Sequence, residues 1–222
     1  MNVRQAGAPS RDFDLERAAS EGFSKFAKEA FPPDMTRLER LKCRLYPRIT
    51  FFFDGTGNNL YQELEKPEHE QALTNVAKLY LAAVNDKQRL GATSTDIPGV
   101  GTPFRIPRVM DGYAPFLRDD PGGAAGLGLG RGGKMRIDYA FSELHMILQQ
   151  DWGRDTIRHM PYVSVAVFGF SRGATEARAF VRHLVKRCGR DDKGLFLFGS
   201  NLGAAVTLRI TFMGLFDTVA SV

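Results

Sequence analysis

The chain has 222 residues, 43% of them hydrophobic, and a formal net charge of +5. This length fits one domain with room for an additional segment. No apolar run reaches the roughly 18 residues that a membrane span needs, and the charged N-terminus does not resemble a secretion signal. Basic and acidic residues are interspersed, which favours a solvated surface over nucleic-acid binding. The two cysteines and four histidines lack metal-ligand spacing, so neither a metal nor another cofactor is expected.

Residues 1–47 are expected to form an N-terminal helical extension. Within 14–31, apolar residues recur every three or four positions, which places them on one face of a helix that Pro32-Pro33 ends. These residues are Leu15, Ala19, Phe23, Phe26 and Ala30. A second short helix is predicted at 37–44. The extension packs on the core or docks on a partner, and its one-sided apolar pattern favours packing.

Residues 48–222 alternate between segments typical of strands and segments typical of helices. Strands are predicted at 49–53, 93–97, 163–168 and 206–215, and helices at 73–84, 135–149 and 175–187. Strands separated by helices indicate an α/β fold with a mostly parallel, doubly wound sheet. In such sheets the active site lies at the carboxyl ends of the strands.

The segment Gly169-Phe170-Ser171-Arg172-Gly173 joins one of these strands to the helix that follows. A serine on a sharp strand-to-helix turn presents its hydroxyl above a parallel sheet, and glycines two residues before and after it avoid collisions of a Cβ. Ser171 is therefore a candidate catalytic nucleophile. The alternative is an ordinary turn in which Ser171 caps the helix.

Two other predicted strands end in motifs that fit the same chemistry. Asp54-Gly55-Thr56-Gly57-Asn58-Asn59 follows the first strand, and an N–H of Gly55 or Thr56, with that of Arg172, would form an oxyanion hole. Asp217 follows the last strand, where an acid that orients a catalytic histidine is expected. The alternatives are a simple Asp-Gly turn and an aspartate that caps a helix.

A glycine-rich segment resembles a nucleotide-binding loop but lacks an essential residue. Residues 128–134 match the first seven positions of a P-loop, whereas Met135 stands where a hydroxyl must bind Mg²⁺. No strand is predicted before this segment. A loop over the active site fits better than nucleotide binding.

Taken together, residues 48–222 resemble the N-terminal part of the catalytic module of type VI secretion lipase effectors of the first family, an α/β-hydrolase domain. The matching stretches, in order, are 52–59, 74–76, 98–102, the glycine-rich segment before Ile137 and Ala140, 169–174 and 216–219. The resemblance implies a serine hydrolase that cleaves phospholipid acyl esters, with Ser171 as nucleophile and Asp217 as triad acid. It also implies a cognate immunity protein, a secretion spike protein as carrier, and delivery from the bacterial cytoplasm to the target-cell periplasm.

The sequence departs from this family at the triad histidine, which should follow Asp217. The four histidines, His69, His145, His159 and His183, all precede it. The α/β-hydrolase-like domain is therefore expected to be incomplete at its C-terminal end, and the chain alone to be inactive. One alternative is a non-catalytic remnant that acts as a binding module. Another is an esterase or thioesterase that acts on small acyl esters.

Overall fold

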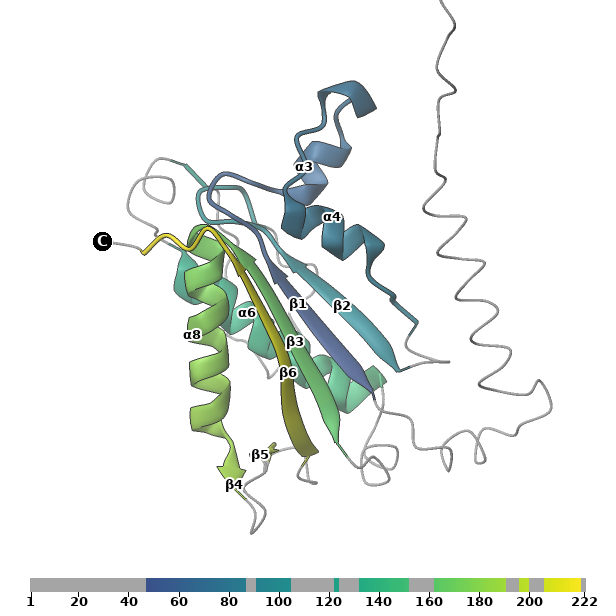
Figure 1. The fold of residues 1–222 in the computed structure, drawn as a ribbon, viewed down its shortest axis with the longest axis vertical. Coiled ribbons are helices and arrows are strands. Elements are labelled where there is room, and N and C mark those ends of the chain that lie inside the picture. The colour runs from purple at the N-terminus through teal and green to yellow at the C-terminus, as the bar shows by residue number, and fades with distance from the viewer. Residues whose placement is uncertain are drawn as a thin grey trace, which may run out of the picture. The chain divides into compact units, whose positions relative to one another are not determined.

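The computed structural model describes residues 47–86, 91–104, 122–123, 132–151, 162–190, 196–199 and 206–220. The two helices predicted within 1–46, and most of the glycine-rich segment, lie outside these residues. The described part of the chain is an α/β fold built on a six-stranded mixed sheet with the strand order β2-β1-β3-β6-β5-β4 (Figure 1).

Four neighbouring strands are parallel and form the main part of the sheet. They are β1 (Arg48–Phe53), β2 (Ala92–Ile97), β3 (Val163–Phe170) and β6 (Val206–Phe216). β1 pairs with β2 on one side and with β3 on the other, and β3 pairs with β6. The carboxyl ends of β1, β3 and β6 therefore lie side by side, as the sequence predicted.

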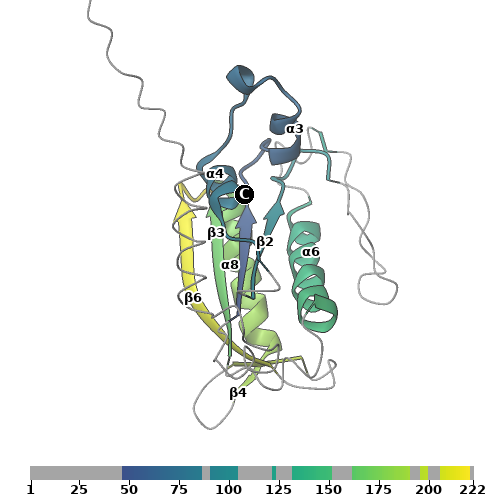
Figure 2. The same ribbon diagram turned by 90° about the vertical axis from the view of Figure 1, so that its right-hand side faces the viewer.

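Helices cover both faces of the sheet, as in a doubly wound fold (Figure 2). On one face lie α6 (Gly133–Met146) and α8 (Arg172–Arg187), and on the other lies α4 (Asn75–Ala82). Successive side chains of β1 point to opposite faces of the sheet and contact helices on both. The Phe51 ring packs 4.9 Å from that of Phe180 on α8, whereas the Phe52 ring lies 5.7 Å from that of Tyr80 on α4.

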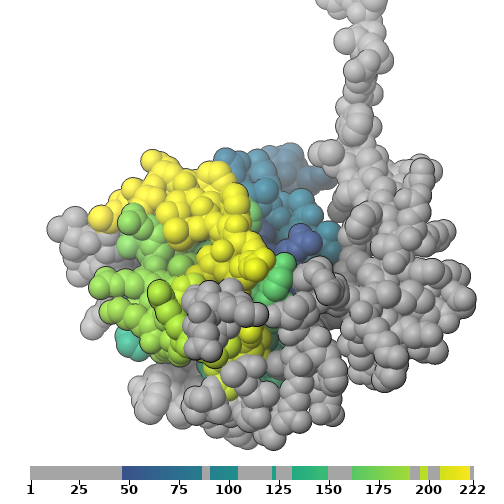
Figure 3. All heavy atoms as spheres, turned by 60° about the horizontal axis from the view of Figure 1, so that its bottom comes forward, coloured from purple at the N-terminus to yellow at the C-terminus, as the bar shows by residue number. Residues whose placement is uncertain are grey.

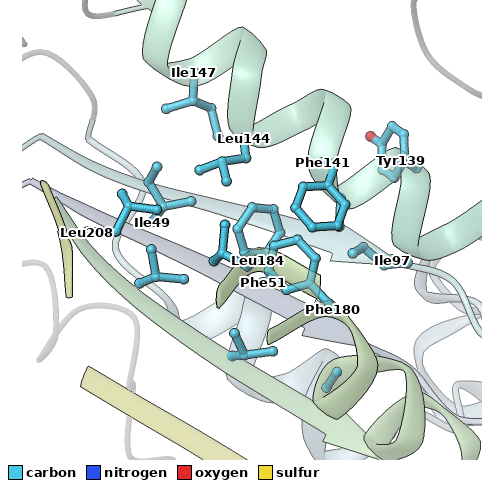
Figure 4. Packing of buried hydrophobic residues seen from close by; sticks show 14 of the residues in the cluster. Ile49, Phe51, Ile97, Tyr139, Phe141, Leu144, Ile147, Phe180, Leu184 and Leu208 are labelled. Atoms are coloured by element: carbon cyan, nitrogen blue, oxygen red, sulfur yellow. The ribbon is translucent and has the colours of Figure 1, made fainter. Parts of the chain in front are cut away.

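A cluster of buried hydrophobic residues fills the space between the sheet and the α6–α8 layer (Figure 4). Phe180 lies at its centre, since its ring contacts those of Phe51, Phe53 and Phe141. Ile97 and Leu144 are fully buried beside them. These residues hold β1, β2, α6 and α8 in a fixed relation, and the candidate site lies where α8 begins beside the end of β1.

The structure also contains elements that the sequence did not predict. These are α3 (Leu60–Leu64), the 3₁₀ turn Glu68–Glu70, the π-helical turn Ile147–Asp151 that continues α6, and the short strands β4 (Gly189–Arg190) and β5 (Phe196–Phe198). β5 pairs antiparallel with β6 and with β4, so the sheet is mixed rather than uniformly parallel.

Candidate active site

Ser171 lies at the sharp turn between β3 and α8, as its flanking glycines predicted. Its backbone angles are φ 53° and ψ −124°, and its side chain makes no capping hydrogen bond to the helix. Ser171 therefore occupies the N-cap position of α8, where its carbonyl accepts from the Ala174 N–H at 3.1 Å, but its hydroxyl does not cap the helix. A positive φ strains a non-glycine residue, and such strain is concentrated at functional sites. The expectation that Oγ faces a cleft stays a prediction.

The glycines on either side of Ser171 are required by close backbone contacts. A Cβ at Gly169 would lie 2.6 Å from the Cα of Ala174, and one at Gly173 would lie 2.2 Å from the carbonyl oxygen of Asp54. Real Cβ atoms do not approach other atoms so closely. Gly173 thus allows the start of α8 to cross directly over the end of β1, and this crossing brings Ser171 beside the 54–59 loop.

The end of β6 is attached to the same turn by hydrogen bonds. The Ser171 N–H donates to the Phe216 carbonyl at 2.9 Å, and the Val219 N–H donates to the Ser171 carbonyl at 3.2 Å. Thr175 Oγ1 donates to the Val219 carbonyl at 2.7 Å. Asp217, with φ 45°, lies between these attachment points on the sheet edge that carries Ser171. It follows a strand and precedes no helix among the described residues, so it is not a helix cap there.

The three predicted oxyanion donors are the N–H groups of Gly55, Thr56 and Arg172, and the first two belong to the 54–59 loop. In the structure one of them has another hydrogen-bond acceptor. The Gly55 N–H donates to the carboxylate of Asp54 at 2.8 Å, so it is already engaged. The Thr56 N–H makes no hydrogen bond within the described residues. Arg172 Nε donates to Thr56 Oγ1, which joins the loop to the Ser171 turn. Thr56 and Arg172 remain the candidate donors.

A second loop, residues 98–102, is hydrogen-bonded to the 54–59 loop. The Gly99 N–H donates to the Asn58 carbonyl at 2.9 Å, and the Gly57 N–H donates to the Val100 carbonyl at 3.0 Å. The two loops are so close that a Cβ at Gly99 would lie 1.7 Å from the Gly55 carbonyl oxygen. The stretch 98–102, which follows β2, therefore determines where the 54–59 loop lies.

Three buried carboxylates lie near these loops. Burial raises the pKa of Asp96 to about 8, with a further contribution from the negative charge of Asp54. Burial also raises the pKa of Glu176 to about 8, although Arg136 and Arg172 oppose the shift. The pKa of Asp54 is raised by burial, against hydrogen bonds from Thr74 and Gly55. Buried acids with perturbed pKa values are common at functional sites. Sequence patterns gave no signal for Asp96 or Glu176.

No described histidine is hydrogen-bonded to Ser171. His145 Nδ1 lies 2.8 Å from the Phe141 carbonyl oxygen on α6, and His69 lies 3.4 Å from a carboxylate oxygen of Glu70. His183 lies three turns along α8, and His159 is outside the described residues. In the described part of the chain, Ser171 and Asp217 therefore share an edge without a histidine between them.

Comparisons with known proteins support the fold class alone. No protein-family model and no curated protein matches the chain. A crystal structure of an uncharacterised protein from Pseudomonas aeruginosa is similar, with 21% sequence identity and a TM-score of 0.57. The match covers 96% of this chain and 34% of the Pseudomonas protein, so the chain spans about a third of that protein's length. No helix among the described residues is long and apolar enough to cross a membrane.

Proposed function

We propose that the chain carries the nucleophile and the triad acid of an α/β-hydrolase that cleaves acyl esters. The observation that carries this proposal is the strained backbone of Ser171 between β3 and α8, with its hydroxyl not used as a helix cap. A turn of this kind is typical of a nucleophile held above a parallel sheet. The proposal assigns catalysis to Ser171 and orientation of the base to Asp217.

In this mechanism Ser171 Oγ adds to the carbonyl carbon of the ester, and its proton passes to a general base. The N–H groups of Thr56 and Arg172 stabilise the negative oxygen of the tetrahedral intermediate. Collapse of the intermediate releases the alcohol, which takes up the proton, and water then hydrolyses the acyl-enzyme. We expect the base to be a histidine outside the described residues, which Asp217 orients.

The substrate class that we propose is membrane phospholipid, which the resemblance of the six matched stretches to type VI secretion lipase effectors favours. The same resemblance supports a cognate immunity protein and a spike protein as partners. It also supports production in the bacterial cytoplasm and delivery to the periplasm of a target cell.

The test is ester hydrolysis by the product of the complete reading frame and by residues 1–222 alone. Phospholipid vesicles and a short-chain soluble ester serve as substrates. We expect the complete product to release fatty acid from vesicles and Ser171→Ala to abolish this release. Ser164→Ala, which changes the serine within β3, is the matched control and should retain activity. Activity that survives Ser171→Ala would contradict the proposal.

Two other functions are distinguished by the same assay. A non-catalytic binding module is favoured by the absence of a histidine bonded to Ser171 among the described residues, and it predicts no turnover in any form of the chain. An esterase or thioesterase of small acyl esters predicts turnover of the soluble ester without release of fatty acid from vesicles.

A further inference from the structure

Arg136 is a fully buried cation in the first turns of α6. Its guanidinium group donates to four backbone carbonyl groups. Nε donates to Pro98 at 2.6 Å, Nη2 donates to Gly99 at 3.0 Å and to Thr102 at 3.1 Å, and Nη1 donates to Gly132 at 3.3 Å. A buried charge is tolerated only when its hydrogen-bonding capacity is used. The planar guanidinium group suits this task because its donors are fixed in direction.

Three of these four carbonyl groups belong to the stretch 98–102, which supports the 54–59 loop. Arg136 therefore holds the backbone to which Asn58 and Gly57 are hydrogen-bonded. Asn59 extends the same connection, because its Nδ2 donates to the Pro103 carbonyl at 2.9 Å. A continuous set of contacts thus leads from Arg136 through the 98–102 stretch to Thr56, one of the two candidate oxyanion donors.

The Arg136 guanidinium group also interacts electrostatically with α8, the helix that follows Ser171. Glu176 lies one turn after Arg172 on α8 and is buried, and although burial raises its pKa, the positive charges of Arg136 and Arg172 favour its ionised form. Its side chain packs against the start of α6, where a Cβ at Gly133 would lie 3.0 Å from Glu176 Oε1. The 98–102 stretch, the start of α6 and the first turns of α8 therefore meet around Arg136 and Glu176.

We propose that Arg136 is a positioning residue of the candidate active site. It fixes the 98–102 stretch, and through it the 54–59 loop, so that the Thr56 N–H points to the oxygen that becomes negative during attack by Ser171. This inference rests on the proposed hydrolase function. It assigns Arg136 no contact with substrate, because all the hydrogen bonds named above are to backbone carbonyl groups.

The test compares Arg136→Met and Arg136→Lys with Lys134→Met in the complete protein. Lys134→Met removes an exposed charge from the same helix and serves as the control. Hydrogen–deuterium exchange of residues 55–59 and 99–102 gives a measurement that needs no activity. We expect at least tenfold faster exchange in both segments of the Arg136→Met variant, with β3 unchanged, and an intermediate increase for Arg136→Lys.

Labelling of Ser171 by a fluorophosphonate gives the second measurement. We expect the limiting rate of labelling to fall at least tenfold in Arg136→Met while the probe concentration at half-saturation changes less than twofold. Gly99→Ala should give the same result with Arg136 intact, because its Cβ collides with the Gly55 carbonyl group. This second variant preserves the test if Arg136→Met does not fold.

The outcomes separate failure of this inference from failure of the proposed function. In Arg136→Met, unchanged hydrogen–deuterium exchange at 55–59, or exchange that rises equally in β3, would overturn the positioning role of Arg136. Unchanged labelling of Gly99→Ala would also overturn it. If the unmodified protein neither reacts with the probe at Ser171 nor hydrolyses esters, the proposed function fails, and with it the role of Arg136 in catalysis.

Discussion

Ser171 and Asp217 hold a backbone conformation that is costly for residues with a side chain. They are the non-glycine residues with positive φ in the described part of the chain. Each such residue costs on the order of 1–3 kcal/mol and persists only where surrounding contacts enforce it. Here the enforcing contacts are the hydrogen bonds between the Ser171 turn and residues 216–219. The glycine spacing around Ser171 predicted its strain, whereas no pattern predicted that of Asp217.

Ser171→Gly should stabilise the protein relative to Ser171→Ala. Glycine relieves the strain at φ 53°, and this gain exceeds the conformational entropy that glycine loses on folding. We expect a difference of about 1 kcal/mol in the free energy of unfolding, or roughly 2–4 °C in Tm for a domain of this size. Thermal unfolding of both variants measures it. Equal Tm values would contradict the strain.

Asp96 should make stability fall with increasing pH. It is 4% exposed, and neither of its carboxylate oxygens has a hydrogen-bond partner among the residues that the structure describes. Its pKa is about 8 in the folded protein against an ordinary 3.8, so the folded state binds the proton more tightly than the unfolded state does. The stabilisation is complete below about pH 4 and is lost as the pH rises to about 8, by an amount on the order of several kcal/mol.

Asp96→Asn should remove most of this pH dependence, because an amide of the same shape does not ionise. Urea unfolding at intervals from pH 5 to pH 9 measures it, with Asp138→Asn on the surface of α6 as the control. A smaller decrease in the free energy of unfolding with rising pH is expected to remain in the variant, since the pKa of Glu176 is also about 8. A profile parallel to that of the unmodified protein would refute the role of Asp96.

Among the elements, the crossing of α8 over the end of β1 is the contact that brings the site together. Gly173→Ala should separate them, because the new Cβ would lie 2.2 Å from the Asp54 carbonyl oxygen. We expect a loss of about 1–3 kcal/mol in unfolding free energy. Gly189→Ala is the control, since its nearest neighbour is 4.0 Å away. Chemical denaturation compares the two, and equal midpoints would show that the crossing is not tight.

Periodicity predicted the long elements well and the short ones poorly. The predicted helix at 73–84 is α4, whose start is fixed by Thr74 Oγ1 accepting from the Ala77 N–H. The five residues of α3 are too few to show a period, and their start depends on the Asn59 side chain. Arg136 could not be identified because an arginine in a helix is ordinarily exposed, and only the three-dimensional structure shows its carbonyl partners.

At the scale of the whole molecule, β6 presents exposed apolar side chains among the described residues. Among the described residues, β5 pairs with it only from Val206 to Leu208, so the remainder has a strand on one side alone. Phe212 is 54% and Met213 44% exposed, and the yellow C-terminal segment is visible at the surface in Figure 3. Open apolar edges of this kind favour association between chains.

We therefore expect purified residues 1–222 to self-associate. Met213→Lys should reduce the association, because a charge on an edge strand opposes pairing. Leu81→Lys, at a similarly exposed apolar position on α4, is the control and should change it less. Light scattering coupled to size-exclusion chromatography gives the mass. A monomer at concentrations of tens of micromolar would contradict the expectation.

The hydrogen bond from the Ser171 N–H to Phe216 has a consequence for the order of folding. Strand β3 and helix α8 are made of neighbouring residues and can associate early, but the partner of Ser171 arrives only with β6, after the whole of α8 has been synthesised. Pairing over such a separation in sequence is slow. We therefore expect the candidate nucleophile to adopt its strained backbone at a late step of folding, so an early intermediate would contain the serine without a formed candidate site.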